Sequence, residues 1–234
     1  MFRAALLLAL LACAALAVAV VVAAEPCGTR PQAGAPEVEG QALSSLERAE
    51  ILKGKIILRE IPSADRKGRT FEAVGVLLAT IDEALSAVTD YRRYGEFMPR
   101  VEKTVVTDES DSVSVVEEYL KLPLGVHRRY RLRYSLCRGD DGFRVDWKKL
   151  PWPEVPLSQS VVDTSGHWQV ERFSEGGLLA FYQVYTDPGR VPLGMKGLAL
   201  SLSKHEIPKV IERVRQRLRS LSAPRTVKDP PSPG

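Results

Sequence analysis

The stretch RYRLRYSLCRGDDGFRVDWK, residues 129–148, decides the fold class. In its first half apolar and polar side chains alternate with a period of two, which is typical of a strand with one buried and one wet face. The residues GDDG at 139–142 indicate a tight hairpin turn, after which the alternation resumes. The apolar face predicted for this hairpin consists of Tyr130, Leu132, Tyr134, Leu136, Phe143, Val145 and Trp147.

Further strands of similar length surround this hairpin. Between Val101 and Asp187 polar turns separate a run of such segments, which predicts an antiparallel meander. Two strands precede the meander, and a second hairpin closes it. The strands expected outside the central hairpin include residues 55–61, 70–79, 166–173 and 178–186.

Helical spacing replaces this alternation near the end of the chain. Apolar residues there recur every three or four positions, which predicts an amphipathic helix whose apolar stripe covers the sheet. Pro208 lacks a backbone donor, so we expect the helix to begin near it or to kink there, with residues 197–202 as a separate upstream turn. The stripe consists of Ile207, Val210, Ile211, Val214, Leu218 and Leu221.

Shorter helices are expected before the meander. Ser44 and Glu47 have the spacing of a capping box for a first helix. A second helix starts after Thr80 or Asp82, and a helical turn covers residues 91–97. The order of elements predicts an α+β domain in which a curved antiparallel sheet packs against one long C-terminal helix.

The N-terminus has the features of an export signal. Arg3 precedes an apolar run from Ala4 to Ala24, and the small residues at its end suit cleavage after Ala24. The run is also nearly long enough to span a bilayer, so an uncleaved signal anchor stays open. Cys13 offers a third interpretation, a lipoprotein-type site. All three place the rest of the chain outside the cytoplasm, in the periplasm, secreted, or anchored to the membrane by residues 1–24.

The rest of the chain is predicted to form one domain between two flanks. The chain has 234 residues, of which 44% are hydrophobic, and this suits a single core. Residues 25–43 and 223–234 have the composition of disordered segments, which leaves 44–222 for the domain. The formal net charge of +4 falls by one when Arg3 is removed. That balance is compatible with an anionic membrane surface and argues against nucleic-acid binding.

Residues that catalysis or metal binding would require are not grouped in the sequence. His127, His167 and His205 lie in separate elements without ligand spacing, so we expect no metal and no cofactor. Motifs for a nucleophile, a phosphate loop or a dinucleotide are absent, so no catalytic residue is assigned and a binding protein is favoured over an enzyme. Cys27 and Cys137 are the thiols left in a mature chain, either bridged or as two free thiols.

Three separated segments resemble one known family. They are TDYRRYGEFMPRV at 89–101, SGHW at 165–168 and YQVYTDPGRVP at 182–192. In this order they resemble the START-like superfamily of polyketide cyclase and coenzyme Q-binding proteins, over about Gly54 to Leu221. One departure is Gly95, where relatives often carry proline. The resemblance implies a helix-grip fold, with the sheet wrapped around the C-terminal helix and an apolar cavity that relatives use for lipids, quinones or polyketides.

The ligand site implied by this resemblance is lined by large apolar and aromatic residues. Each of them can equally serve as plain core, because an amphipathic strand buries its apolar face with or without a ligand. The candidate lining consists of Phe97, Tyr119, Tyr134, Trp147, Trp168, Tyr182, Met195 and Leu198. His167 offers a polar contact for a ligand head group, or a structural bond. Arg129, Arg131 and Arg133 are expected on the solvated face.

These residues favour a non-enzymatic carrier of a hydrophobic small molecule or lipid in the cell envelope. A cyclase or dehydrase-like enzyme that uses the same cavity is the alternative. A third hypothesis is that the fold is reused for protein contacts. The basic side of the last helix, Lys209 to Arg219, offers a peripheral contact with anionic phospholipid, or is an ordinary solvated face.

Overall fold

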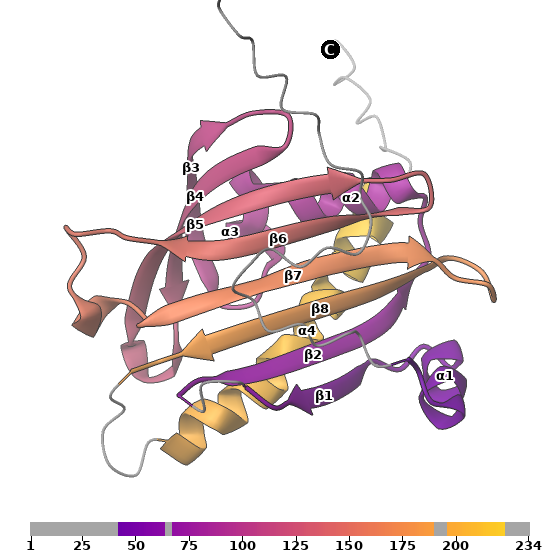
Figure 1. Ribbon diagram of the computed structural model, residues 1–234, viewed down its shortest axis with the longest axis horizontal. Helices are drawn as coiled ribbons and strands as arrows, with labels where there is room; N and C mark the ends of the chain where they lie inside the picture. Colours follow the sequence, from indigo (N-terminus) through magenta and orange to yellow (C-terminus); the bar gives the residue numbers. More distant parts are fainter. Residues whose placement is uncertain (1–41, 64–66, 190–195, 223–234) are drawn as a thin grey trace, which may run out of the picture.

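A computed structural model describes residues 42–63, 67–189 and 196–222 of the chain. Over these residues the chain forms one eight-stranded antiparallel sheet and several helices (Figure 1). The strands are β1 (Ile57–Ile61), β2 (Arg69–Leu77), β3 (Val101–Glu109), β4 (Val113–Lys121), β5 (His127–Arg138), β6 (Gly142–Leu150), β7 (Asp163–Arg172) and β8 (Leu178–Asp187). The helices are α1 (Ser45–Leu52), α2 (Ile81–Thr89), α3 (Tyr94–Phe97) and α4 (Lys196–Ser222), with short 3₁₀ turns η1 (Tyr91–Arg93), η2 (Pro123–Gly125) and η3 (Leu157–Gln159).

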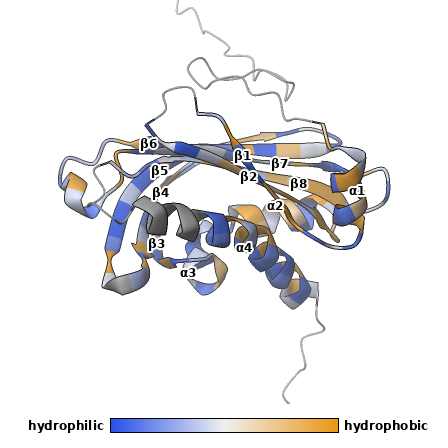
Figure 2. Cartoon of the chain, turned by 90° about the horizontal axis from the view of Figure 1, so that it is seen from below, coloured by the Kyte–Doolittle hydropathy of each residue, from blue (hydrophilic) through white to orange (hydrophobic). Residues whose placement is uncertain are grey.

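The sheet is a meander closed by an added hairpin. Its strand order is β1-β2-β8-β7-β6-β5-β4-β3, so the six strands from β3 to β8 pair in sequence and the β1–β2 hairpin joins β8. The sheet arches over α2, α3 and α4 (Figure 2). We call the face turned toward α4 the inner face and the opposite one the outer face. The predicted α+β architecture, a curved antiparallel sheet around a long C-terminal helix, is confirmed.

Local sequence signals fix where the first two helices begin. Ser44 caps α1 through a capping box with Glu47, as the spacing predicts. Thr80, rather than Asp82, caps α2 and forms a second capping box with Glu83. These boxes satisfy backbone donors that a helix N-terminus leaves unpaired.

The C-terminal helix α4 is longer than the sequence indicates. It runs without a break from Lys196 to Ser222, so the expectation of a separate turn over residues 197–202 is wrong. Pro208 removes one backbone donor, but packing against the sheet outweighs the loss of a single intrahelical bond. The stripe of Ile207, Val210, Ile211, Val214 and Leu218 is buried as predicted, whereas Leu221 is half exposed at 50%.

Close contact between α4 and β2 depends on a glycine. A Cβ atom on Gly75 would lie 3.2 Å from Cγ2 of Ile211, so the missing side chain lets the helix approach the strand. Arg215 then donates hydrogen bonds to the carbonyls of Val76 and Gly54, at 2.8 and 2.9 Å. The helix is thus held against the sheet by apolar contacts and by a bound arginine.

The outer face carries a second, smaller core. Ile51 of α1 packs there with Val74, Phe173 and Leu179.

Within the described ranges, no helix is long and apolar enough to cross a membrane.

Candidate functional site

Aromatic rings form a continuous strip across the inner face. Tyr91 lies 4.4 Å from Tyr134 between ring centroids, Tyr134 lies 6.1 Å from Trp147, and Trp147 stacks on Tyr182 at 5.4 Å. Trp168 contacts the same tyrosine at 4.8 Å. These separations are those of favourable aromatic pairs. We call this set the aromatic strip; it consists of Tyr91, Tyr94, Tyr134, Trp147, Trp168 and Tyr182.

Strand register explains how the strip is assembled. Tyr134 of β5 pairs with Trp147 of β6, and Trp168 of β7 pairs with Tyr182 of β8. Gly166 lies opposite Trp147, and a Cβ atom there would lie 2.4 Å from the indole ring. The absent side chain therefore provides the space in which that ring lies across β7. This is the structural role of the glycine in the SGHW segment.

A buried carboxyl group lies beside the strip. Glu118 of β4 is only 6% exposed, and its Oε1 accepts a hydrogen bond of 2.5 Å from the Tyr134 hydroxyl. Tyr130 of β5, which is paired opposite Glu118, also hydrogen-bonds to it. Burial raises the pKa of Glu118, and the hydrogen bonds from Tyr134 and Tyr130 act in the opposite direction. Burial thus favours the neutral form of this carboxyl group.

The tyrosines around Glu118 keep their protons. Burial is the main cause that raises the pKa values of Tyr130, Tyr134 and Tyr182, and the nearby charge of Glu118 acts in the same direction. Their hydroxyl groups therefore stay available as hydrogen-bond donors at any physiological pH. The inner face combines apolar rings with a small number of grouped polar atoms, as ligand sites commonly do.

Four of the predicted lining residues come together in the aromatic strip: Tyr134, Trp147, Trp168 and Tyr182. Phe97 lies at the edge, where it is half-buried and contacts Tyr94 at 5.6 Å. Met195 lies outside the described residues. Leu198 belongs to α4, but its side chain is outside the described part of the structure.

Tyr119 does not lie on the inner face, so the prediction that placed it in the lining needs correction. Its strand neighbour Glu118 occupies the inner position, and period two turns Tyr119 outward, opposite Arg129. There its ring meets Trp152 edge-on at 6.3 Å and lies 5.5 Å from the Lys103 ammonium group. The prediction was off by one residue because both faces of β4 carry valine and glutamate, which leaves the alternation ambiguous.

His167 is on the outer face, where it pairs with Gln183 and Asp146 in the neighbouring strands. Burial lowers the pKa of His167 to about 3, with the nearby Arg144 charge as a second cause. The histidine is therefore a neutral structural residue and does not reach the aromatic strip. Among the described residues, no group of three or more histidine, cysteine or acidic side chains suits a metal ion.

The basic residues fall into two groups. Arg129 and Arg131 lie on the outer face as expected, but their guanidinium groups cover the Trp152 ring at 5.7 and 4.8 Å. On α4, Arg217 is mostly buried and pairs with Asp90 at 2.7 Å, and Arg215 is bound to backbone carbonyls. These two α4 arginines hold the helix in place and do not form a solvated basic face.

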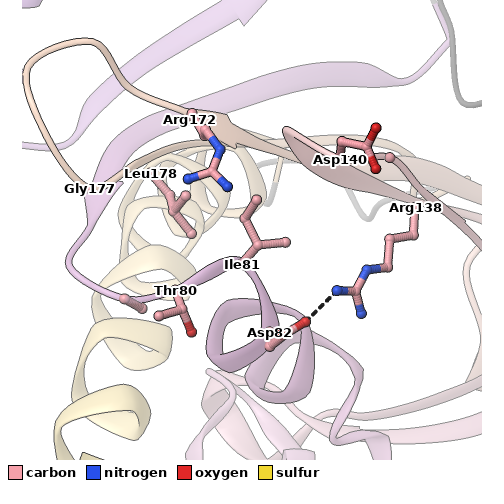
Figure 3. Close-up of a pocket in the computed structure, with 10 residues that line it drawn as sticks. Thr80, Ile81, Asp82, Arg138, Asp140, Arg172, Gly177 and Leu178 are labelled. Atoms are coloured by element: carbon pink, nitrogen blue, oxygen red, sulfur yellow. Dashed lines mark hydrogen bonds and ion pairs between the residues drawn. The ribbon is translucent and has the colours of Figure 1, made fainter.

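Two hollows open at the rim of the inner layer. The larger, about 520 Å³, lies between the start of α2 and the turns that follow β5 and β7 (Figure 3). Charged side chains line it, including Asp82 and Arg138, which form an ion pair of 2.5 Å. The smaller, about 170 Å³, is lined by Tyr91 and Tyr134 together with residues of α2 and the β3–β4 turn. Only the smaller hollow of these two reaches the aromatic strip.

The arrangement is similar to several solved structures. A STAR-related lipid transfer protein from Xanthomonas axonopodis matches with a TM-score of 0.60 and 19% identity, over 70% of this chain and 93% of that chain. Human StAR-related lipid transfer protein 5 matches with a TM-score of 0.61 and 13% identity, over 73% and 84%. The Zhui aromatase/cyclase from Streptomyces sp. R1128 matches with a TM-score of 0.53 and 13% identity, over 70% and 94%.

No protein-family model matches the sequence, and no curated protein matches it. At identities this low, the structural matches establish the fold and nothing finer. The chain therefore has the START-like helix-grip fold that its three sequence segments indicate.

Proposed function

We propose that this chain, with its START-like helix-grip fold, binds a hydrophobic molecule against the inner face of its sheet and carries it in the cell envelope. The observation that carries the proposal is the aromatic strip beneath α4. A dry core needs apolar volume, whereas this strip also presents tyrosine hydroxyls around a buried carboxyl group. Such groups fix the orientation of a ligand.

The names of the similar structures support the same class of ligand. Two are lipid transfer proteins and one is an aromatase/cyclase. Both names are compatible with a hydrophobic guest in the same fold. Met195 and Leu198 stay proposed as further lining residues.

Loading requires movement in this proposal. The hollow beside Tyr91 and Tyr134 has about 170 Å³, below the roughly 300–1,000 Å³ of typical small-molecule sites. A lipid-sized ligand therefore enters as the helices separate from the sheet. The proposed gate is Phe97, the last residue of α3, whose ring lies 5.5 Å from the Arg217 guanidinium group. The exposed Arg213 and Arg219 of α4 are proposed to meet anionic phospholipid.

A cyclase-like enzyme is the second candidate, favoured by one observation. Glu118 is a carboxyl group whose pKa is raised by burial, and it lies among tyrosine hydroxyls. A neutral acid of this kind can donate a proton or a hydrogen bond to a ligand carbonyl. Turnover of a co-purified ligand, followed by mass spectrometry, would favour the enzyme over the carrier.

The binding function is tested by a quinone probe, such as a short-chain ubiquinone analogue, titrated against tryptophan fluorescence. We expect wild type to bind it. Replacing Tyr182 with phenylalanine is expected to weaken binding severalfold while changing the free energy of unfolding by less than ~1 kcal/mol, because only the hydroxyl group is lost.

Tyr119→Phe is the matched control, since it removes the same hydroxyl from the outer face. It is expected to leave probe affinity unchanged. If wild type binds neither this probe nor any apolar molecule co-purified from its source, the strip is plain core and the carrier proposal fails.

Export is proposed from the apolar run that follows Arg3. We expect a mature N-terminus at Glu25, measured by N-terminal sequencing of protein from the envelope fraction. An intact Met1 in the membrane pellet would indicate a signal anchor instead, and recovery from the cytosol would contradict export.

A further inference from the structure

The polar end of the proposed site is a single carboxyl group, that of Glu118, which has no cationic side chain paired with it among the described residues. Among the described residues, the hydrogen-bonding partners of Glu118 are Tyr134 and Tyr130, and no lysine, arginine or histidine is paired with it. A buried carboxylate would need such a partner, because removing an unpaired charge from water is costly. The position is therefore built for a neutral carboxyl group, which offers one donor hydrogen and free acceptor positions.

Tyr182 supplies a second polar atom on the same aromatic strip. Its ring stacks on Trp147 at 5.4 Å, and Trp147 lies 6.1 Å from Tyr134, whose hydroxyl bonds to Glu118. The Tyr182 hydroxyl makes no hydrogen bond to another described residue. The side chain is half-buried although it lies on the inner face. Its hydroxyl, without a hydrogen-bond partner among the described residues, can bond a guest.

We propose that Glu118 and Tyr182 form the polar end of the ligand site and select molecules that end in an uncharged hydroxyl or carbonyl group over molecules that end in a carboxylate. This inference rests on the proposed binding function and adds the chemical class of the ligand. The neutral carboxyl group of Glu118 donates a hydrogen bond to the oxygen of a guest hydroxyl or carbonyl group, and the Tyr182 hydroxyl offers a further hydrogen bond along the strip. An anionic head group would meet a buried acid with no cation to neutralise it.

The hollow through which a ligand would reach Glu118 favours the same uncharged ligands. The smaller hollow is lined by Tyr134, whose hydroxyl bonds to Glu118, and by Tyr91. The same hollow is bordered by Glu109 at the end of β3, which pairs with Arg92 at 2.6 Å, and by Asp111 of the β3–β4 turn. A carboxylate that enters here is repelled by the like charge of Asp111, whereas an uncharged alcohol is not.

A pair of ligands that differ only in the head group tests the inference. Dodecanol and dodecanoate are compared at about pH 8, where the fatty acid is ionised, by displacement of the uncharged probe N-phenyl-1-naphthylamine. We expect wild type to bind dodecanol about tenfold or more tightly than dodecanoate. This comparison needs no variant, so it stands even if substitutions at Glu118 impair folding.

Three variants then test whether Glu118 causes the preference for dodecanol over dodecanoate. Glu118→Gln keeps an uncharged donor and acceptor and is expected to preserve the preference. Glu118→Leu is expected to weaken dodecanol binding by about tenfold while leaving the naphthylamine probe bound. Glu117→Gln is the matched control, because Glu117 is the adjacent residue on the outer face, bound to Arg131. It is expected to change neither affinity.

The two levels of the proposal fail in different ways. If wild type binds the naphthylamine probe but holds dodecanoate as tightly as dodecanol, the assignment of Glu118 and Tyr182 is overturned and ligand binding stands. An unchanged dodecanol affinity in a folded Glu118→Leu protein overturns it as well. If wild type binds none of the three molecules, the binding function itself fails and this inference with it.

Discussion

A chain that ends before Ile207 is expected not to fold. Four of the buried residues that such a truncation removes from the inner layer, Ile207, Ile211, Val214 and Leu218, are between 0% and 8% exposed. Burying each contributes ~1.5–3 kcal/mol, so their loss removes roughly 6–12 kcal/mol. A typical domain is stable by about 5–15 kcal/mol in total. Removing the helix also exposes the aromatic strip to water, which promotes aggregation.

Solubility, far-ultraviolet circular dichroism and thermal melting of the purified chains measure this effect. A chain that ends after Ser222 is the matched control, because it keeps all of α4. We expect that control to melt at the wild-type temperature. A soluble protein that lacks residues 207–234 and still melts at the wild-type temperature would show that α4 is dispensable, which its contacts with β2 argue against.

The buried face of a single strand or helix could be predicted from the sequence where its apolar residues recur at regular spacing. The alternation in β5 and β6 places Tyr134 and Trp147 on the buried face, and the structure confirms both. The stripe of α4 is likewise set by spacing along one helix. Such patterns need no knowledge of which strand pairs with which.

The polar end of the site depends on long-range pairing, and for that reason the sequence did not show it. Glu118 lies in VSVVEEYLK, where valine and glutamate occupy both faces, so the inner face of β4 is decided only by its register with β5. Pairing puts Glu118 opposite Tyr130 and turns Tyr119 outward. A signal was available for His167, because its neighbour Trp168 is a predicted lining residue and period two sends adjacent residues to opposite faces.

Replacing Trp168 with alanine is expected to lower the free energy of unfolding by ~3–5 kcal/mol, measured by urea denaturation. The indole is 2% exposed and is among the largest fully buried side chains of the described residues. It packs against Tyr182 at 4.8 Å, so its removal leaves a cavity in the middle of the aromatic strip. An equally large loss is not expected at Trp152→Ala, the control on the outer face.

The size of the Trp168 effect also decides how the ligand site is formed. Trp152 is half-buried beneath the Arg131 guanidinium group, 4.8 Å from its ring, and that contact is worth ~0.5–1 kcal/mol. A loss of this smaller size at Trp168 would mean that its ring has few partners to lose, so that the inner face already holds an open cavity. The expected larger loss means instead that the strip is closed in the free protein. Binding must then separate α4 or α3 from the sheet, and variants that loosen these helices should load ligand faster while melting at a lower temperature.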